Sequence, residues 1–267
     1  MSIQVHSTAI VENGAEIGDG TSIGPYSVIG RHVKLGANNI IGSHVVIEGN
    51  TSIGDGNKIF QFASVGSIPQ DLKYHGEESR LVIGSKNLIR EFVTLQPGTE
   101  GGGMITEIGN GNLFMANSHV GHDSKIGNSN IFANSVAVAG HVQIGSRAIL
   151  GGLSGIHQFV RLGDLCLISA GAMVSKDVPP FCIAHGDHAT LIGINKIGME
   201  RAGFDAAEIA LVRKLFRMIF LSKGAFKDRI NKGASIIGES KAGQSMISFM
   251  VGSSRGVCVY DARTVGG

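Results

Sequence analysis

The chain has 267 residues with 40 Gly and only 5 Pro, is 43% hydrophobic and 16% charged, and carries a net charge of +2. Glycine at about twice its usual share without a G-X-Y period excludes collagen, and the apolar content excludes a disordered chain. The near-neutral charge, with no block of Lys and Arg, argues against nucleic acid as a partner. No run of 18 apolar residues and no signal sequence is present, so we expect a cytoplasmic protein without a transmembrane segment.

An aliphatic residue or Phe recurs at every sixth position from the start of the chain. The 26 positions are Val5, Val11, Ile17, Ile23, Ile29, Leu35, Ile41, Ile47, Ile53, Ile59 and Val65, then Ile83, Ile89 and Leu95, then Ile108, Phe114, Val120, Ile126, Phe132, Val138, Ile144, Leu150, Ile156, Leu162, Ile168 and Val174. Gly follows directly at 14 of them. A period of six fits neither a helix nor a half-buried strand, and a β-sandwich would show alternation with turns every 8–12 residues.

The repeat predicts an all-β solenoid over residues 1–190, a parallel β-helix in which three hexapeptides close one triangular coil. The aliphatic residue should point inward, and the small residue after it should turn the corner, often with a positive φ. The [LIV]-G-x-x-x-x pattern resembles that of the hexapeptide-repeat acyltransferases. This resemblance implies that the coils are left-handed.

Two segments interrupt the register, at about 66–82 and 97–107, and both are polar or rich in glycine. We expect them to form external loops. Loops on a rigid repeat scaffold usually carry binding or partner contacts, and tolerated decoration is the alternative.

The register ends after Pro179 and Pro180, and residues 191–267 are predicted to form a C-terminal helical subdomain. Asp205 and Glu208 have the spacing of a capping box. The apolar residues that follow at helical spacing are Ile209, Val212, Phe216, Ile219 and Phe220. Residues 196–267 contain 12 Lys and Arg against 6 Asp and Glu. This basic excess indicates either a solvated helix face or a docking surface for an acidic protein or a phosphorylated ligand.

Several polar residues should gather on one edge of three adjacent coils, because each position lies below the one 18 residues later. The predicted cluster contains His119, His122, Asp123, Gly140, His141, His157 and Gln158. The histidines could bind zinc, as in γ-class carbonic anhydrases that share the repeat, or form a hydrogen-bonded cluster without catalytic role. A third interpretation is general-base catalysis, in which a carboxylate such as Asp123 orients a histidine and the Gly140 N–H binds an oxyanion.

At these residues the sequence closely resembles the UDP-N-acetylglucosamine 3-O-acyltransferase family, which performs the first step of lipid A biosynthesis. The resemblance covers nearly the whole chain. The matching segments are PQDLKY (69–74), IREFVTLQPGT (89–99), NSHVGHDSKIGN (117–128), AGHV (139–142), GIHQFVRLG (155–163), DVPPF (177–181), GINKIGMERAGF (193–204) and SSRG (253–256).

The resemblance implies that His122 is the general base on the glucosamine 3-hydroxyl, that Asp123 orients it and that the Gly140 N–H serves the oxyanion. The hydroxyl attacks the thioester of an (R)-3-hydroxyacyl chain that acyl carrier protein delivers on its phosphopantetheine. The resemblance implies no cofactor, no metal and no covalent acyl-enzyme. It also implies a homotrimer with sites between the subunits.

By the same resemblance, further residues bind the substrates. They are Asp71, Lys73, His119 and His141 around the sugar and the catalytic base, and His157, Gln158, Asn195 and Arg201 on the nucleotide or acyl-carrier side. Ala170 is the counterpart of a groove residue that limits acyl length. The sequence departs from the family pattern at Gln96, where many members have His, and at Ile197, where many have an acidic residue.

Three related activities are the alternatives. The N-acyltransferase of the same pathway carries a separate N-terminal uridine-binding domain, for which repeats that start at Val5 leave no room. A CoA-dependent acetyltransferase would use acetyl-CoA instead of an acyl carrier protein. The sequence also leaves open whether the acceptor is UDP-N-acetylglucosamine or its 3-amino analogue.

Overall fold

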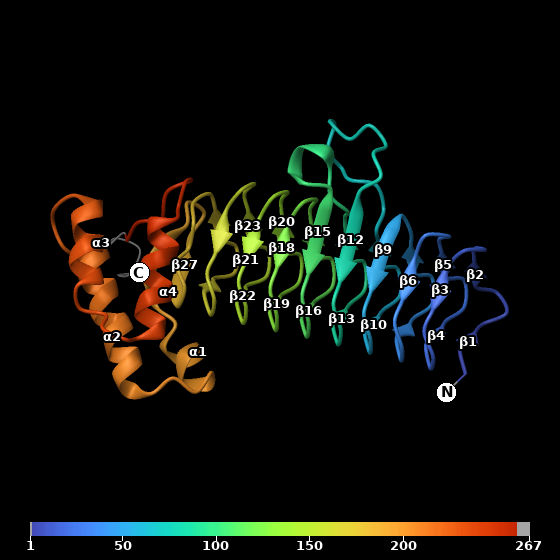
Figure 1. Ribbon diagram of the computed structural model, residues 1–267, viewed down its shortest axis with the longest axis horizontal. Coiled ribbons are helices and arrows are strands. Elements are labelled where there is room, and N and C mark those ends of the chain that lie inside the picture. Colours follow the sequence, from blue (N-terminus) through green and yellow to red (C-terminus); the bar gives the residue numbers. More distant parts are fainter. Residues whose placement is uncertain (1, 261–267) are drawn as a thin grey trace.

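A computed structural model describes residues 2–260 of the chain. Its β region is a coil of very short strands that build three parallel sheets along one axis, with the helices at one end (Figure 1). We call the 11-stranded sheet face A, the 9-stranded sheet face B and the 8-stranded sheet face C. The corners between them are named AB, BC and CA in the direction of the chain. The last seven residues of the predicted subdomain 191–267 lie outside the described residues.

Successive strands of the chain visit the three faces in turn. Face A contains β1 (Gln4–Val5), β4 (Ser22–Ile23), β7 (Ile40–Ile41), β10 (Lys58–Ile59), β13 (Leu88–Ile89), β16 (Leu113–Phe114), β19 (Ile131–Phe132), β22 (Ile149–Leu150), β25 (Leu167–Ile168), β27 (Cys182–His185) and the antiparallel β28 (Thr190–Ile194). Face B contains β2 (Ile10–Val11), β5 (Val28–Ile29), β8 (Val46–Ile47), β11 (Ser64–Val65), β14 (Thr94–Leu95), β17 (His119–Val120), β20 (Ala137–Val138), β23 (Gly155–Ile156) and β26 (Met173–Val174). Face C contains β3 (Glu16–Ile17), β6 (Lys34–Leu35), β9 (Asn50–Ile53), β12 (Arg80–Ile83), β15 (Ile105–Ile108), β18 (Lys125–Ile126), β21 (Gln143–Ile144) and β24 (Arg161–Leu162).

The core of the β-helix contains the sixth-position residues, each of which ends a strand, and smaller apolar residues that precede the next strand, such as Val33, Val93 and Val136. Stacked coils pair residues 18 apart, as Ile131 with Ile149 and Phe132 with Leu150, so each buried residue packs on its counterparts in the neighbouring coils. The first coil covers its sixth-position residues least: Val11 and Ile17 are only partly buried against the core. There Val5 is 47% exposed, because no coil lies beneath it to remove it from water.

At most corners the left-handed residue is the third after the aliphatic residue, and not the first as expected. Asn38 has a φ of 56° and Arg147 one of 58°. The glycines that directly follow the aliphatic residues are needed for a different reason. A Cβ on Gly18 would lie 2.4 Å from the carbonyl carbon of Gly36 in the next coil. The first corner position is therefore restricted by the close approach of two backbones.

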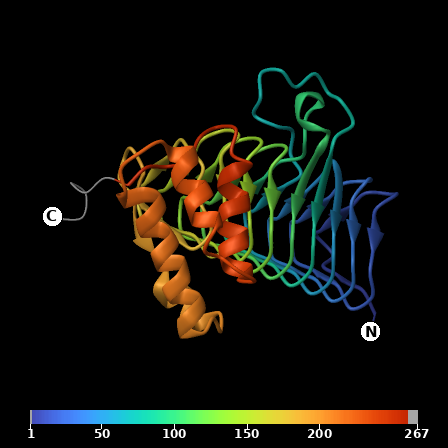
Figure 2. The same cartoon turned by 60° about the vertical axis from the view of Figure 1, so that its left-hand side comes forward.

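Two loops leave the scaffold at the BC corner and lie side by side (Figures 1 and 2). The first spans residues 66–79 and the second residues 96–104, so both end three residues earlier than the sequence predicts. The reason is strand pairing, because β12 and β15 begin with an additional pair of residues in which Arg80 lies opposite Ile105.

The C-terminal region consists of α1 (Lys196–Arg201), α2 (Ala206–Phe216), the π-helical η2 (Arg217–Leu221), α3 (Phe226–Ala234) and α4 (Lys241–Val251). The predicted apolar positions of α2 and η2 are all buried. Asp205 caps α2 by accepting a hydrogen bond from the Glu208 N–H at 2.8 Å. Glu208 does not complete the capping box, because its carboxylate accepts from Ser240. Among the described residues, no helix has the length and apolar character that a membrane span requires.

The three faces present different side chains outward. Face A carries an apolar stripe over its C-terminal half: Leu88, Leu113, Ile131, Ile149, Leu167 and Ile183. Face C is charged, with ion pairs between Lys34 and Glu16 and between Lys125 and Glu107. Face B carries small residues at β20 and β23, namely Ala137 and Gly155. Among residues 2–260, face A therefore carries the longest run of outward apolar side chains.

Candidate active site

The BC corner places a histidine and a carboxylate side by side. His122 and Asp123 lie between β17 and β18, and both are buried. Asp123 is in the left-handed region, with a φ of 58°, which the short side chain of Asp tolerates better than most. Its backbone N–H donates to Thr106 Oγ1 at 2.7 Å. The corner geometry of the repeat thus directs two neighbouring polar side chains to one place.

The Asp123 carboxylate determines which tautomer the His122 ring adopts. His122 Nδ1 lies 2.8 Å from Asp123 Oδ2. A carboxylate can only accept, so Nδ1 carries the proton and Nε2 keeps a free lone pair. The Asp123 carboxylate also accepts from the Thr99 N–H at 2.9 and 3.1 Å and from Thr99 Oγ1 at 2.6 Å. This arrangement prepares His122 Nε2 to accept a proton.

Two groups flank the free nitrogen of His122. Asp71, in the first loop, brings Oδ2 to 3.7 Å from His122 Nε2. Gly140 lies on the next coil, and a Cβ there would be 2.5 Å from His122 Cε1 and Nε2. Its N–H donates to no acceptor in residues 2–260. A glycine is therefore required at this position, and it leaves a backbone donor close to the His122 ring.

Two further histidines are kept neutral by their surroundings. His141 stacks on Phe159 with ring centroids 4.5 Å apart and meets His122 edge-on at 4.9 Å. Burial lowers the pKa of His141, although the Asp123 carboxylate opposes the shift. Burial, and to a lesser extent the His122 charge, lowers the pKa of His119, whose Nδ1 lies 2.7 Å from Thr94 Oγ1. A neutral imidazole can donate a hydrogen bond to a hydroxyl group of a ligand and accept one from another.

A groove of about 620 Å³ runs over face B beside the dyad. His119, Ala137, Gly155 and Met173 follow one another on successive strands along its floor. A Cβ on Gly155 would be 2.8 Å from Met173 Sδ, so the thioether covers the glycine. The groove thus runs from His119 over the small residues Ala137 and Gly155 to Met173, where Ser175, Asp187 and His188 also line it.

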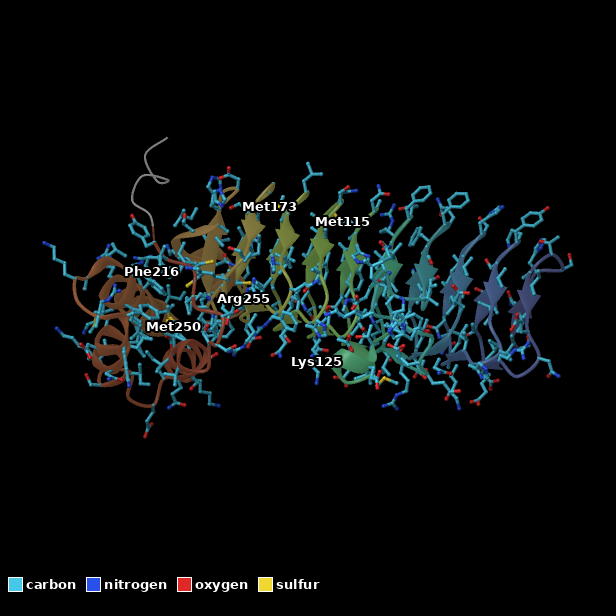
Figure 3. All side chains as sticks on the ribbon, turned by 90° about the horizontal axis from the view of Figure 1, so that it is seen from above. Met115, Lys125, Met173, Phe216, Met250 and Arg255 are labelled. Atoms are coloured by element: carbon cyan, nitrogen blue, oxygen red, sulfur yellow. The ribbon has the colours of Figure 1, made fainter. Side chains whose placement is uncertain are left out.

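His157 also lines this groove and connects it to the C-terminal segment. Arg255 Nη2 lies 2.8 Å from His157 Nδ1, and the same guanidinium donates to the Ser175 carbonyl at 2.7 Å. Figure 3 shows Arg255 where the helical region meets the β-helix. Gln158 and Lys73 are exposed, and the Lys73 N–H donates to Asp71 Oδ1 at 3.0 Å.

Asn195 and Arg201 lie on face A, away from the dyad at the BC corner. They line a groove of about 750 Å³, together with Ile197, over strands β19, β22 and β25. Asn195 is the N-cap of α1, since its Oδ1 accepts from the Gly198 N–H and its Nδ2 donates to the Leu165 carbonyl, both at 2.9 Å. One chain therefore does not bring all the predicted site residues together.

Two further positions named in the sequence analysis, Ala170 and Gln96, lie outside the pair of His122 and Asp123. Ala170 is exposed at the AB corner, and its backbone lies against Gly151 of the preceding coil. Gln96 is buried beneath the first loop, where its Nε2 lies 3.5 Å from the Ile68 carbonyl.

The dyad and His141 are also the group that could hold a metal, since one ligand atom from each lies within 4.8 Å of the others. The donor set fits poorly. Asp123 already accepts hydrogen bonds from Thr99 and His122, and His122 Nδ1 is used in this pair. Two imidazole nitrogens remain, whereas catalytic zinc takes three protein ligands.

Sequence reasoning missed Thr99 and Arg255 as parts of the site. Both lie inside matching segments, IREFVTLQPGT and SSRG, so their location was available. Their contacts were not, because Thr99 reaches Asp123 from a loop and Arg255 reaches His157 across 98 residues.

Comparisons with known proteins agree with this geometry. Residues 14–49 match the family model of the bacterial transferase hexapeptide (six repeats), and residues 177–258 match that of domain 2 of UDP N-acetylglucosamine O-acyltransferase. An acyl-[acyl-carrier-protein]–UDP-N-acetylglucosamine O-acyltransferase of Myxococcus xanthus is 49% identical over 255 residues, which cover 95% of this chain and 98% of the relative.

Solved structures show the same likeness. The UDP-N-acetylglucosamine O-acyltransferase of Moraxella catarrhalis has 40% identity and a TM-score of 0.93 over 95% of this chain and 98% of its own. The UDP-N-acetylglucosamine acyltransferase of Francisella novicida has 36% identity and a TM-score of 0.94 over 99% of both chains. The left-handed β-helix with a helical C-terminal region is thereby confirmed. The chain belongs to the family of acyl-[acyl-carrier-protein]–UDP-N-acetylglucosamine O-acyltransferases.

Proposed function

We propose that this protein transfers an (R)-3-hydroxyacyl chain from acyl carrier protein to the glucosamine 3-hydroxyl of UDP-N-acetylglucosamine, the first step of lipid A biosynthesis. The observation that carries the proposal is the pair of His122 and Asp123, with Nδ1 and Oδ2 2.8 Å apart and Nε2 free. This pair lies in a chain whose relatives are named for that reaction. The expected location in the cytoplasm remains a prediction.

His122 Nε2 takes the proton of the 3-hydroxyl as its oxygen attacks the thioester carbonyl carbon. The Asp123 carboxylate stabilises the imidazolium that forms, and the Gly140 N–H donates to the oxyanion of the tetrahedral intermediate. Collapse of this intermediate breaks the C–S bond. The imidazolium then returns the proton to the leaving thiolate, so the ester and the phosphopantetheine thiol are the products. The step requires no cofactor, metal or acyl-enzyme.

The sugar would bind between the first loop and the BC corner. Asp71 is already next to His122 Nε2, and Lys73 lies near enough to influence the charge of His141. His119 and His141 supply neutral imidazoles on either side. In this proposal Asp71 accepts from a sugar hydroxyl and the histidines hold the ring beside the base.

The acyl chain would occupy the groove on face B, which starts at His119 and ends at Met173. His157 and Gln158 lie on its acyl-carrier side. Ala170, at the AB corner, is the position we propose to limit chain length.

Arg201 and Asn195 would contact the nucleotide, and Arg201 suits phosphate because its guanidinium offers a planar fork of donors. Both lie on face A, so they would reach a nucleotide at the BC corner of a second subunit. A homotrimer in which face A of one subunit covers face B of the next meets this requirement. It would also bury the apolar stripe of face A, which a single chain leaves half-exposed. The basic C-terminal region would then attract an acidic carrier protein.

The first experiment is an acyl-transfer assay with 3-hydroxyacyl carrier proteins of several chain lengths, UDP-N-acetylglucosamine and a metal chelator. We expect an O-acylated product, a single preferred length and no effect of the chelator. Transfer only to the 3-amino analogue would change the acceptor. Transfer only from acetyl-CoA would replace the proposal with a CoA-dependent acetyltransferase, and loss with chelator would indicate a metal enzyme.

A further inference from the structure

The second loop holds the Asp123 carboxylate in place. Thr99 is 2% exposed and directs both its backbone N–H and its hydroxyl at this carboxylate. Gly102 of the same loop also packs against this side chain, since a Cβ there would be 1.9 Å from Asp123 Cγ. Of the side-chain groups that contact the carboxylate, the Thr99 hydroxyl is the closest, at 2.6 Å from Oδ2.

The first loop in turn holds the second. Glu77 Oε1 accepts from the Glu100 N–H at 3.0 Å, directly after Thr99, and Glu77 Oε2 accepts from the His75 N–H at 2.8 Å. These backbone donors lower the pKa of Glu77, which keeps it ionised as an acceptor. The two loops therefore form a connected support from Glu77 through Glu100 and Thr99 to Asp123.

The His122 ring has a carboxylate at each nitrogen. Asp123 Oδ2 lies 2.8 Å from Nδ1, and Asp71 Oδ2 lies 3.7 Å from Nε2. A neutral imidazole has one N–H, so the two carboxylates compete for it. If the proton moved to Nε2, that nitrogen could not accept a proton from the substrate hydroxyl. The position of the Asp123 carboxylate consequently decides whether the ring is in the reactive tautomer.

We propose that Thr99 is a positioning residue for acyl transfer. Its hydroxyl and N–H orient the Asp123 carboxylate toward His122 Nδ1 and so keep the proton away from Nε2. The inference rests on the proposed function for its catalytic consequence, although the tautomer itself is a property of the free protein.

The test compares Thr99→Val, which keeps the shape and removes the hydroxyl, with Thr99→Ser, which keeps the hydroxyl. Thr51→Val is the matched control, because Thr51 is also buried and donates at 2.6 Å to the Glu48 carbonyl, without contact to the dyad. We expect Thr99→Val to lower kcat about 10- to 100-fold with KM for both substrates within about threefold. Thr99→Ser and Thr51→Val should keep kcat within about threefold of the native value.

A second readout needs no substrate. In protein labelled with ¹⁵N-histidine, the native His122 should show a protonated Nδ1 and an unprotonated Nε2, and Thr99→Val should show a mixture of tautomers. An unchanged tautomer together with native kcat in Thr99→Val would overturn the proposal, as would an equal loss of kcat in Thr51→Val. Absence of acyl transfer in the native protein would instead refute the proposed function, and the spectrum would still decide the role of Thr99.

Discussion

The BC and CA corners of the same β-helix use buried polar side chains in opposite ways. Along the CA corner a ladder of asparagines runs through five successive coils: Asn39, Asn57, Asn87, Asn112 and Asn130. Asn57 is typical, since its backbone N–H and side-chain Nδ2 both donate to Asn39 Oδ1, at 2.8 and 3.0 Å. At the BC corner the sequence of contacts from Thr99 to Asp123 to His122 ends at a nitrogen that has no hydrogen bond within the described chain.

The difference separates stabilising from reactive polar groups. An Asn ladder repeats because each amide oxygen accepts from the coil above it, and burial without these bonds would be costly. Within the described residues, Nδ2 of the last member, Asn130, has no partner. The BC corner cannot repeat in this way, because the two loops enter there and replace coil contacts by Asp71 and Thr99. A polar group that the scaffold leaves unsatisfied is available to a substrate.

The largest effect should follow from His122→Ala. Without the base, kcat/KM should fall about 10²- to 10⁴-fold. The thermal midpoint should fall only slightly, because the ring contacts the next coil only at Gly140 and edge-on at His141 and makes one hydrogen bond, to Asp123. Initial rates with an acyl carrier protein thioester and a thermal melt measure both. Activity within tenfold of native would remove His122 as the base.

Leu113→Asp tests whether the site at the BC corner needs a second subunit for activity. The asparagine ladder of the CA corner, in contrast, forms within one chain. A charge on the apolar stripe of face A should prevent association, so a sedimentation experiment should find monomers and the rate per chain should drop at least about tenfold. Val82→Asp places the same charge on face C, where Val82 is 37% exposed, and should leave both properties unchanged. An active Leu113→Asp monomer would refute a site between subunits.

Asn57→Ala should affect stability but not rate. It leaves the Asn87 N–H and Nδ2 without the acceptor that they use at 2.8 and 3.0 Å, which should lower the free energy of unfolding by about 2–4 kcal/mol. Asn110→Ala is the control, because its Oδ1 accepts from the Ser85 N–H at an exposed site where water can replace it. Urea unfolding compares the two, and kcat at low temperature should be native in both.

Ala170→Met should shorten the preferred acyl chain. Ala170 stands three residues before Met173, which lines the groove. In our proposal a longer side chain at residue 170 reaches the Met173 end of the groove, and each excluded methylene is worth about 0.8 kcal/mol of binding. Competition between two chain lengths in one assay gives the ratio of kcat/KM directly. An unchanged ratio would place the length limit elsewhere, and Met173→Ala would then test the thioether.

The smallest effect concerns pH. In the folded state, burial lowers the pKa of His119 below its ordinary value of 6.5. Below about pH 6.5 the unfolded chain therefore binds the proton more readily than the folded chain does. The stability that neutral His119 allows is present above that pH and is lost as the pH falls. The thermal midpoint should therefore decrease from pH 7 to pH 5, and less so in His119→Gln. The asparagines of the CA corner do not titrate, so they should not contribute to this pH dependence of the thermal midpoint.

Much of this molecule could be predicted from its sequence because the repeat is one-dimensional. Residues 18 apart must stack, so Gly140 above His122 and His141 above Asp123 followed from counting. Counting residues did not predict the structure where the chain leaves the hexapeptide register. The loops end before Arg80 and Ile105 because the pairing of β12 with β15 begins there. The left-handed corner position depends on backbone geometry that the glycine pattern does not reveal.

The sequence by itself determined the coil, its core and the corner at which the histidines gather, since each of these depends on a local period. Only the tertiary structure decided which polar groups face one another. Asp71, Thr99 and Arg255 reach His122, Asp123 and His157 from segments without register. Tertiary structure likewise placed Asn195 and Arg201 on a different face from the dyad. The physical reason is that hydrogen bonds and charge pairs act over a few ångströms in space, and the repeat fixes such distances only for residues that belong to it.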